Sequence, residues 1–269
     1  MYMFNKSLVF LGVVLISSLT FSQQIMSEQR MDGMSPSGNA TTTCNVTFSS
    51  GSGHNTTQFC VTVNGNITQF SRDGQEMINF GSPVGEGYGI CDQTGGTRYY
   101  DYAYEDSGNW LSPTFTHSGN VVSVTRTTSD GLFKLKQTIT NVPATTSSAA
   151  AAKMTLAITN LSSTARFVIL IRYANVNAAG SIPNDFEWTP DSVFGLRPSG
   201  FGGLSLTSSS VSVPFHSGLV NKVPDGPDPC QQIFSVNFFE GDGSIEFFYH
   251  MLPLAAHATK TVVMTYKPF

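Results

Sequence analysis

The sequence predicts an all-β fold, a large antiparallel β-sandwich stabilised by disulfides. Three long strand-like runs follow one another, residues 121–128, 132–142 and 154–176, the last with a break near Ser162. Asp130 and Gly131 lie between the first two runs, and Asp-Gly is a strong signal for a tight hairpin. The mature chain has no comparable run with helical periodicity.

The second of these runs alternates in polarity. Phe133 and Leu135 fall on one face, whereas Lys134 and Lys136 fall on the other, as expected of a half-buried strand. Residues 167–171 are apolar on both faces, which is typical of a strand at the centre of a sheet that is covered on both sides.

The first 22 residues have the pattern of an export signal. Lys6 precedes an apolar run at residues 8–19, and small residues lie before a cut ahead of Gln23. The run is short against the roughly 20 residues that span a bilayer, so we expect cleavage rather than a membrane anchor. We expect residues 23–43 to be a flexible tail, 44–269 to be a single domain, and the protein to be extracellular or periplasmic.

The charge balance argues against two classes of partner. The chain has 14 Lys and Arg against 18 Asp and Glu, a net charge of −4. No basic surface for nucleic acid is indicated, and an anionic membrane would repel the chain. Because no second long apolar run follows the signal, we expect no stable membrane insertion after cleavage.

The four cysteines, Cys44, Cys60, Cys91 and Cys230, fit an oxidising compartment. Four cysteines allow three pairings. Cys44 and Cys60 lie in adjacent strand-like runs, which favours a 44–60 bridge and leaves 91–230 as the second. Their spacing does not fit a zinc site, so we expect no metal and no cofactor.

Shorter strands are predicted on both sides of the central runs. They are residues 44–48, 58–63, 67–70, 76–80 and 97–104 before them, and 204–207, 211–215, 232–239, 244–251 and 259–266 after them. Residues 177–198 are expected to form a long irregular segment, which is often functional. Asp185, Glu187 and Asp191 within it could hold calcium, but their spacing matches no EF-hand loop.

The most unusual stretch is residues 85–110. If 97–104 is a strand, alternate tyrosines share one face and acids lie beside them. Aromatic faces stack on sugar C–H faces, and carboxylates accept hydrogen bonds from sugar hydroxyls. The alternative is that the tyrosines are cross-strand pairs that stabilise a sheet edge. The candidate ligand-binding residues are Tyr100, Asp101, Tyr102, Tyr104, Glu105 and Trp110.

Two segments carry a resemblance to a known family. Residues 125–131 with the strand Lys134-Leu-Lys-Gln-Thr138, and residues 154–160 with the apolar strand to Asn177, resemble the β-supersandwich of galactose mutarotases. The resemblance implies two large sheets with a concave face that meets carbohydrate. Mutarotases use catalytic His and Glu residues on that face, which do not map onto this sequence residue by residue. The chain is also similar in style to uncharacterised exported bacterial β-rich proteins.

Three functions are compatible with these features. The leading one is a secreted β-sandwich that binds an extracellular ligand, most plausibly a glycan, through the aromatic and acidic stretch. A carbohydrate-active enzyme of epimerase, lyase or hydrolase type would instead need a carboxylate pair, with candidates Glu86, Asp101, Glu105, Asp185 and Glu187. A structural or adhesive envelope protein would self-associate through exposed strand edges.

Overall fold

The structure is a computed structural model that describes residues 40–78, 85–178, 183–198, 202–210, 213, 216–221, 226–231 and 238–269. These residues all fall within one compact unit, Gly33–Phe269. They form 18 β-strands and a short 3-10 helix, η1 (Gly53–Asn55), which confirms the all-β prediction. The predicted export signal and nearly all of the predicted tail lie outside the described residues.

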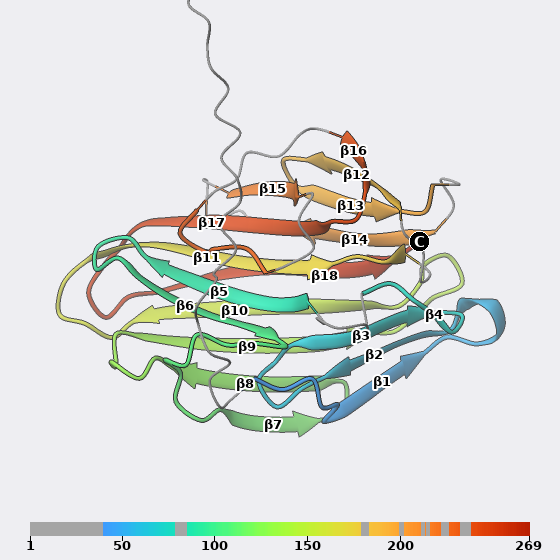
Figure 1. Ribbon diagram of the computed structural model, residues 1–269. Helices are drawn as coiled ribbons and strands as arrows, with labels where there is room; N and C mark the ends of the chain where they lie inside the picture. The colour runs from blue at the N-terminus through green and yellow to red at the C-terminus, as the bar shows by residue number, and fades with distance from the viewer. Residues whose placement is uncertain are drawn as a thin grey trace, which may run out of the picture. The chain divides into compact units, whose positions relative to one another are not determined.

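The largest sheet has nine antiparallel strands in the order β16-β12-β13-β14-β18-β10-β9-β8-β7 (Figure 1). Its centre is built from the predicted runs, because their alternating apolar residues bury one face of the sheet. The strands are β7 (Thr114–Ser118), β8 (Val121–Thr127), β9 (Phe133–Val142), β10 (Ala151–Asn160), β12 (Asn184–Thr189), β13 (Ser192–Leu196), β14 (Gly203–Ser208), β16 (Phe238–Gly241) and β18 (Thr259–Pro268).

The second sheet has five antiparallel strands in the order β15-β17-β11-β5-β6. The predicted apolar strand at its centre, β11, is buried on both faces from Val168 onward. Its strands are β5 (Gly85–Asp92), β6 (Thr97–Ala103), β11 (Arg166–Asn175), β15 (His216–Asn221) and β17 (Ser244–Leu254). Two of these, β5 and β15, were not predicted from the sequence, and neither was β7 of the large sheet.

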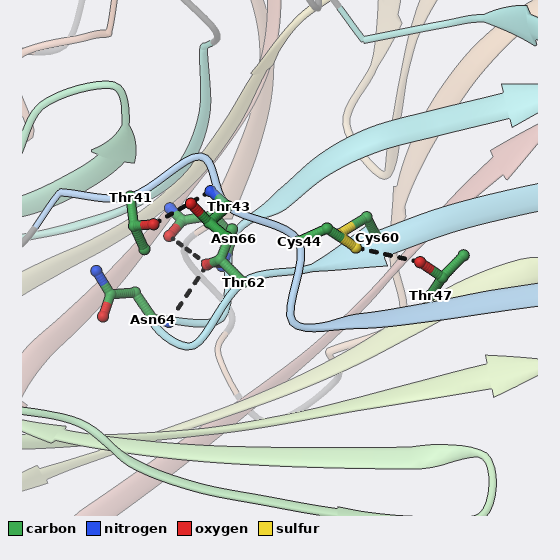
Figure 2. The surroundings of a disulfide bond; sticks show 8 residues. All are labelled: Thr41, Thr43, Cys44, Thr47, Cys60, Thr62, Asn64 and Asn66. Atoms are coloured by element: carbon green, nitrogen blue, oxygen red, sulfur yellow. Dashed lines mark hydrogen bonds between the residues drawn. A yellow bond between two sulfur atoms is a disulfide. The ribbon is translucent and has the colours of Figure 1, made fainter.

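The third sheet has four strands in chain order, β1 (Val46–Ser50), β2 (Thr57–Val61), β3 (Ile67–Arg72) and β4 (Gln75–Glu76). Figure 2 shows how its β2–β3 turn is held. Thr62 Oγ1 donates to Asn66 Oδ1 at 3.1 Å and accepts from the backbone N–H groups of Asn64 and Asn66. Three described asparagines, Asn45, Asn55 and Asn66, begin Asn-x-Thr sequences, which are acceptors for N-glycosylation in secreted proteins of eukaryotes. Asn66 is fully buried, whereas Asn45 and Asn55 are exposed.

The two smaller sheets pack against the nine-stranded sheet around one continuous apolar core. From the four-stranded sheet, the Phe70 ring lies 6.3 Å from Tyr266 of β18. From the five-stranded sheet, the Tyr99 ring lies 5.8 Å from Phe133 of β9. Each fully buried large apolar side chain contributes about 1.5–3 kcal/mol relative to an exposed one, which makes this core the main source of stability.

The prediction of an irregular segment at residues 177–198 is wrong, because β12 and β13 form a hairpin within it. Phe186 and Val193 are buried and alternate with more exposed neighbours, as strand periodicity requires. Their apolar runs are too short for the pattern to stand out in the sequence. The predicted strand at 211–215 and most of the one at 232–239 lie outside the described residues.

Both predicted disulfides are present, Cys44–Cys60 and Cys91–Cys230. The first links the start of the domain to β2, and the second links β5 to a late loop. Two disulfides are consistent with an extracellular or periplasmic protein. In the part of the chain that the structure describes, no helix has the length and apolar character needed to cross a membrane.

Candidate functional site

Two of the six predicted ligand-binding residues, Asp101 and Trp110, lie in the interior between the sheets. The Asp101 carboxylate accepts hydrogen bonds from Arg126 of β8 at 2.5 Å and from Asn64 at 2.8 Å. The Trp110 ring is only 3% exposed and lies 5.1 Å from the Arg126 guanidinium carbon, a cation–π contact. Because β6 turns Asp101 inward, the folded protein offers neither side chain to a ligand on its surface.

A second buried ion pair lies beside the first. Glu86 of β5 contacts Arg172 of β11 at 2.5 Å, and Arg172 also donates to Gln137 of β9 at 2.8 Å. Burial raises the pKa of Glu86 to about 7, although the charge of Arg172 opposes this shift. Burial likewise raises the pKa of Asp101 to about 6 against Arg126. Asp101 pairs with Arg126 of β8, and Glu86 holds Arg172, which donates to Gln137 of β9. Both acids thus help to join the five-stranded sheet to the nine-stranded sheet in the interior.

The opposite face of β6 and β11 carries what we term the tyrosine cluster, Tyr100, Tyr102, Tyr104 and Tyr173, in which Tyr104 is half-buried and the other three are fully buried. The rings of Tyr100 and Tyr102 are stacked, with centroids 4.9 Å apart and an interplanar angle of 20°. Tyr173 meets Tyr102 edge-on at 4.9 Å. Both arrangements are favourable for aromatic pairs, so the rings form one packed cluster.

Glu246 of β17 adds a carboxylate to the tyrosine cluster. It lies directly opposite Tyr173 in the β11–β17 ladder and is only 2% exposed. Ser244 Oγ donates to Glu246 Oε1 at 3.0 Å. Burial, and then the charge of Glu246, raise the pKa of Tyr102, and burial together with the neighbouring tyrosines and Glu246 raises that of Tyr173. The phenols therefore stay protonated and keep their hydroxyl donors.

Two buried polar atoms of β11, Tyr173 Oη and Asn175 Oδ1, have no hydrogen-bond partner among the residues that the structure describes. Tyr173 lies opposite Glu246 in the ladder with β17, and Asn175 lies opposite Ser244. Leaving a buried polar group unpaired costs about 1–3 kcal/mol, so such atoms mark positions where a partner is expected. Gly85 leaves room for the phenol, because a Cβ at Gly85 would lie 2.1 Å from Tyr173 Oη.

A loop, residues 226–231, covers part of the tyrosine cluster. Tyr102 Oη donates to Pro227 O at 2.5 Å, and the N–H of Gly226 donates to Tyr104 Oη at 3.2 Å. Only glycine fits at 226, because a Cβ there would lie 2.1 Å from a Tyr102 ring carbon. The disulfide of Cys230 fixes the far end of the loop to β5.

Tyr104 and Glu105 form the partly exposed rim of the cluster. Ala103 has φ of 69°, and this left-handed conformation ends β6 and turns the chain. Glu105 then accepts a hydrogen bond from Tyr100, which together with burial raises the pKa of Tyr100. The structure thus brings together four predicted site residues, Tyr100, Tyr102, Tyr104 and Glu105, and separates them from Asp101 and Trp110.

Sequence reasoning missed Tyr173, Asn175 and Glu246. All three come from strands that are apolar along most of their length, and such strands look structural. The available signal was Glu246 itself, a lone acid in the apolar run 245–249. A buried acid in a central strand requires partners for its carboxylate, such as the hydroxyl of Ser244.

The remaining predicted acids lie elsewhere, on the β12–β13 hairpin. Asp185 is half-buried, whereas Glu187 and Asp191 are exposed, and Asp191 contacts His216 at 2.9 Å. Among the described residues, no group of three or more His, Cys, Asp or Glu side chains is arranged to hold a metal ion.

Comparison with known proteins gives a likeness of fold. No family model and no curated protein sequence matches the chain. A bacterial glucoamylase complexed with acarbose superposes with a TM-score of 0.57 at 8% identity, over 87% of this chain and 33% of that one. The GalM/aldose epimerase homologue from C. elegans gives 0.51 at 11% identity, over 83% and 98%. A galactose mutarotase-like protein from Lactobacillus casei gives 0.49 at 10%, over 83% and 100%.

These likenesses confirm the resemblance in fold to galactose mutarotase-like proteins. At identities this low they establish the fold alone, because one fold hosts many functions. The chain spans about a third of the glucoamylase, so it corresponds to only one part of that protein.

Proposed function

We propose that the protein is a secreted carbohydrate-binding β-sandwich whose ligand meets the tyrosine cluster at its partly exposed rim, Tyr104 and Glu105, with Glu246 buried behind it. The observation that carries this proposal is the pair of buried polar atoms, Tyr173 Oη and Asn175 Oδ1, which lack a hydrogen-bond partner among the described residues and belong to the strand that carries part of the cluster. Sugars offer apolar C–H faces for the rings and hydroxyls for the polar atoms.

The fold and the disulfides support the same proposal. The solved structures that share the fold include a glucoamylase complexed with acarbose and an aldose epimerase homologue, both named for action on carbohydrates. Two disulfides suit an exported protein, which would meet extracellular glycans.

A pull-down of the purified protein on insoluble polysaccharides, combined with a glycan array, tests the proposal. We expect retention on at least one glycan. Tyr104→Ala should weaken it about tenfold, because loss of an aromatic contact is worth about 1.5 kcal/mol. Phe238→Ala is the matched control, since Phe238 is 57% exposed on the nine-stranded sheet. No retention, or equal behaviour of the two variants, would contradict the proposal.

A second candidate is a carbohydrate-active enzyme at the same face. It is favoured by two carboxylates, Glu105 and Glu246, which both act on the tyrosine cluster. Paired carboxyls on either side of a sugar are the usual arrangement for acid–base chemistry at an anomeric carbon. Release of sugar or interconversion of anomers, abolished by Glu246→Gln, would identify an enzyme; binding without either would leave a binding module.

A further inference from the structure

A separate cleft lies where the four-stranded sheet meets the nine-stranded sheet. We term it the arginine cleft. Its volume is about 490 Å³, within the range of roughly 300–1,000 Å³ typical of small-molecule sites. It shares no residue with the tyrosine cluster. Its lining residues are Arg72, Asp73, Gln75, Met77, Arg197, Gly202 and Phe269.

Both arginines of the cleft retain donors for a ligand. Arg197 Nη1 reaches Gln75 Oε1 only at 3.4 Å, and no carboxylate of the described residues forms an ion pair with Arg197. Arg72 Nη2 donates to Asn55 Oδ1 at 3.0 Å. Each guanidinium has five N–H donors, so most of them have no acceptor among the described residues.

The one acidic side chain in the lining is largely engaged elsewhere. Asp73 Oδ1 accepts the N–H of Thr56 at 3.0 Å, while Asp73 Oδ2 lies 3.9 Å from Arg72 Nε. The contact with Arg72 is too long for a strong hydrogen bond. In a chain of net charge −4, the cleft is therefore a local site where cations outnumber acidic side chains.

Phe269 provides an apolar wall beside these cations. Its ring is 37% exposed, and it is held edge-on against Phe194 at 6.1 Å. Its backbone exchanges two hydrogen bonds with Gly203, at 3.1 and 3.2 Å. Met77, buried at the same cleft, extends the apolar surface.

We propose that the arginine cleft binds an acidic sugar, a uronate residue, as a second site independent of the tyrosine cluster. Guanidinium groups pair with carboxylates through two parallel hydrogen bonds. Phe269 can stack on the C–H face of the sugar ring, and the Gln75 amide can both donate to and accept from hydroxyls. An inorganic anion would use the arginines but not the ring wall.

Isothermal titration calorimetry of the purified protein with trigalacturonate tests this proposal, with neutral galactotriose and inorganic phosphate as comparison ligands. We expect binding of trigalacturonate that is at least tenfold tighter than that of either comparison ligand. Arg197→Gln should weaken it at least tenfold, and Arg197→Lys should also weaken it, because lysine keeps the charge but loses the planar fork.

Two control variants distinguish binding in the arginine cleft from binding at another part of the surface. Lys134→Gln removes an exposed cation from β9 and should leave the affinity for trigalacturonate unchanged. Phe238→Ala removes an exposed ring from β16, outside both proposed sites, and should also leave it unchanged. The proposal is overturned if trigalacturonate does not bind, if phosphate or galactotriose binds equally well, or if Arg197→Gln behaves like Lys134→Gln.

Discussion

At the scale of single residues, two buried tyrosines differ in whether their hydroxyl has a hydrogen-bond partner. Tyr249 and Tyr173 are both fully buried tyrosines of the five-stranded sheet. Tyr249 Oη donates to Ser208 Oγ at 2.8 Å, whereas Tyr173 Oη has no partner in the described part of the chain. If the Tyr173 hydroxyl serves to bind a ligand, it contributes nothing to the stability of the ligand-free protein.

Tyr173→Phe should therefore leave the free energy of unfolding unchanged or raise it. Tyr249→Phe should lower it by about 1 kcal/mol, because a satisfied hydrogen bond is lost. Urea denaturation of both variants measures the difference. An equal loss of stability in the two variants would show that Tyr173 Oη has a structural partner.

The buried ion pairs give a second prediction at this scale. Arg172→Met should lower the free energy of unfolding by about 3–5 kcal/mol, because Glu86 loses its buried partner in the core. The double variant Glu86→Leu with Arg172→Met should recover most of that loss. Chemical denaturation provides the measurement, and a double variant no more stable than the single one would show that the unpartnered carboxyl is not the cause.

At the scale of elements, the strands that could be predicted are those whose own residues show the alternation. β8, β9, β10 and β11 match the predicted runs to within a few residues at each end, as does their Asp-Gly turn. β12 and β13 could not be predicted, because each buries few apolar side chains and is held mainly by its neighbours. β5 was missed because three glycines remove its side-chain pattern.

The two disulfides should differ in their effect on stability. Cys91 and Cys230 are separated by 139 residues, Cys44 and Cys60 by only 16. In the chain-entropy model, removing a bridge of roughly 100 residues or more loses about 1.5–2 kcal/mol more than removing one of about 15. Guanidinium unfolding of the two double Cys→Ser variants measures this. A larger loss for the 44–60 pair would contradict it.

At the scale of the whole molecule, the fold was predictable but the site was predictable only in part. Tyr100, Tyr102, Tyr104 and Glu105 are close in sequence and remain close in space. Tyr173 and Glu246 reach the same face from strands far along the chain, and that pairing depends on sheet order, which a single sequence does not encode locally. The inward turn of Asp101 follows from strand alternation, but its partner Arg126 does not.

The buried acids should also make stability depend on pH. The pKa of Glu86 is raised from 4.5 to about 7 and that of Asp101 from 3.8 to about 6, in both cases chiefly by burial. Between the ordinary and raised values the folded protein binds more protons than the unfolded chain, so stability is lost as pH rises from about 4 to about 7. Glu86→Gln should reduce this slope in thermal melts. Wild-type stability that rises with pH over this window would contradict the raised pKa values of Glu86 and Asp101.

Carbohydrate binding at the tyrosine cluster can be tested by hydroxyl-radical footprinting of the protein with and without a saturating glycan from the array. We predict that oxidation of the half-buried Tyr104 decreases on binding, while oxidation of the exposed Phe238 stays constant. Protection confined to other surfaces, with the tyrosine cluster unchanged, would show that this face does not bind carbohydrate.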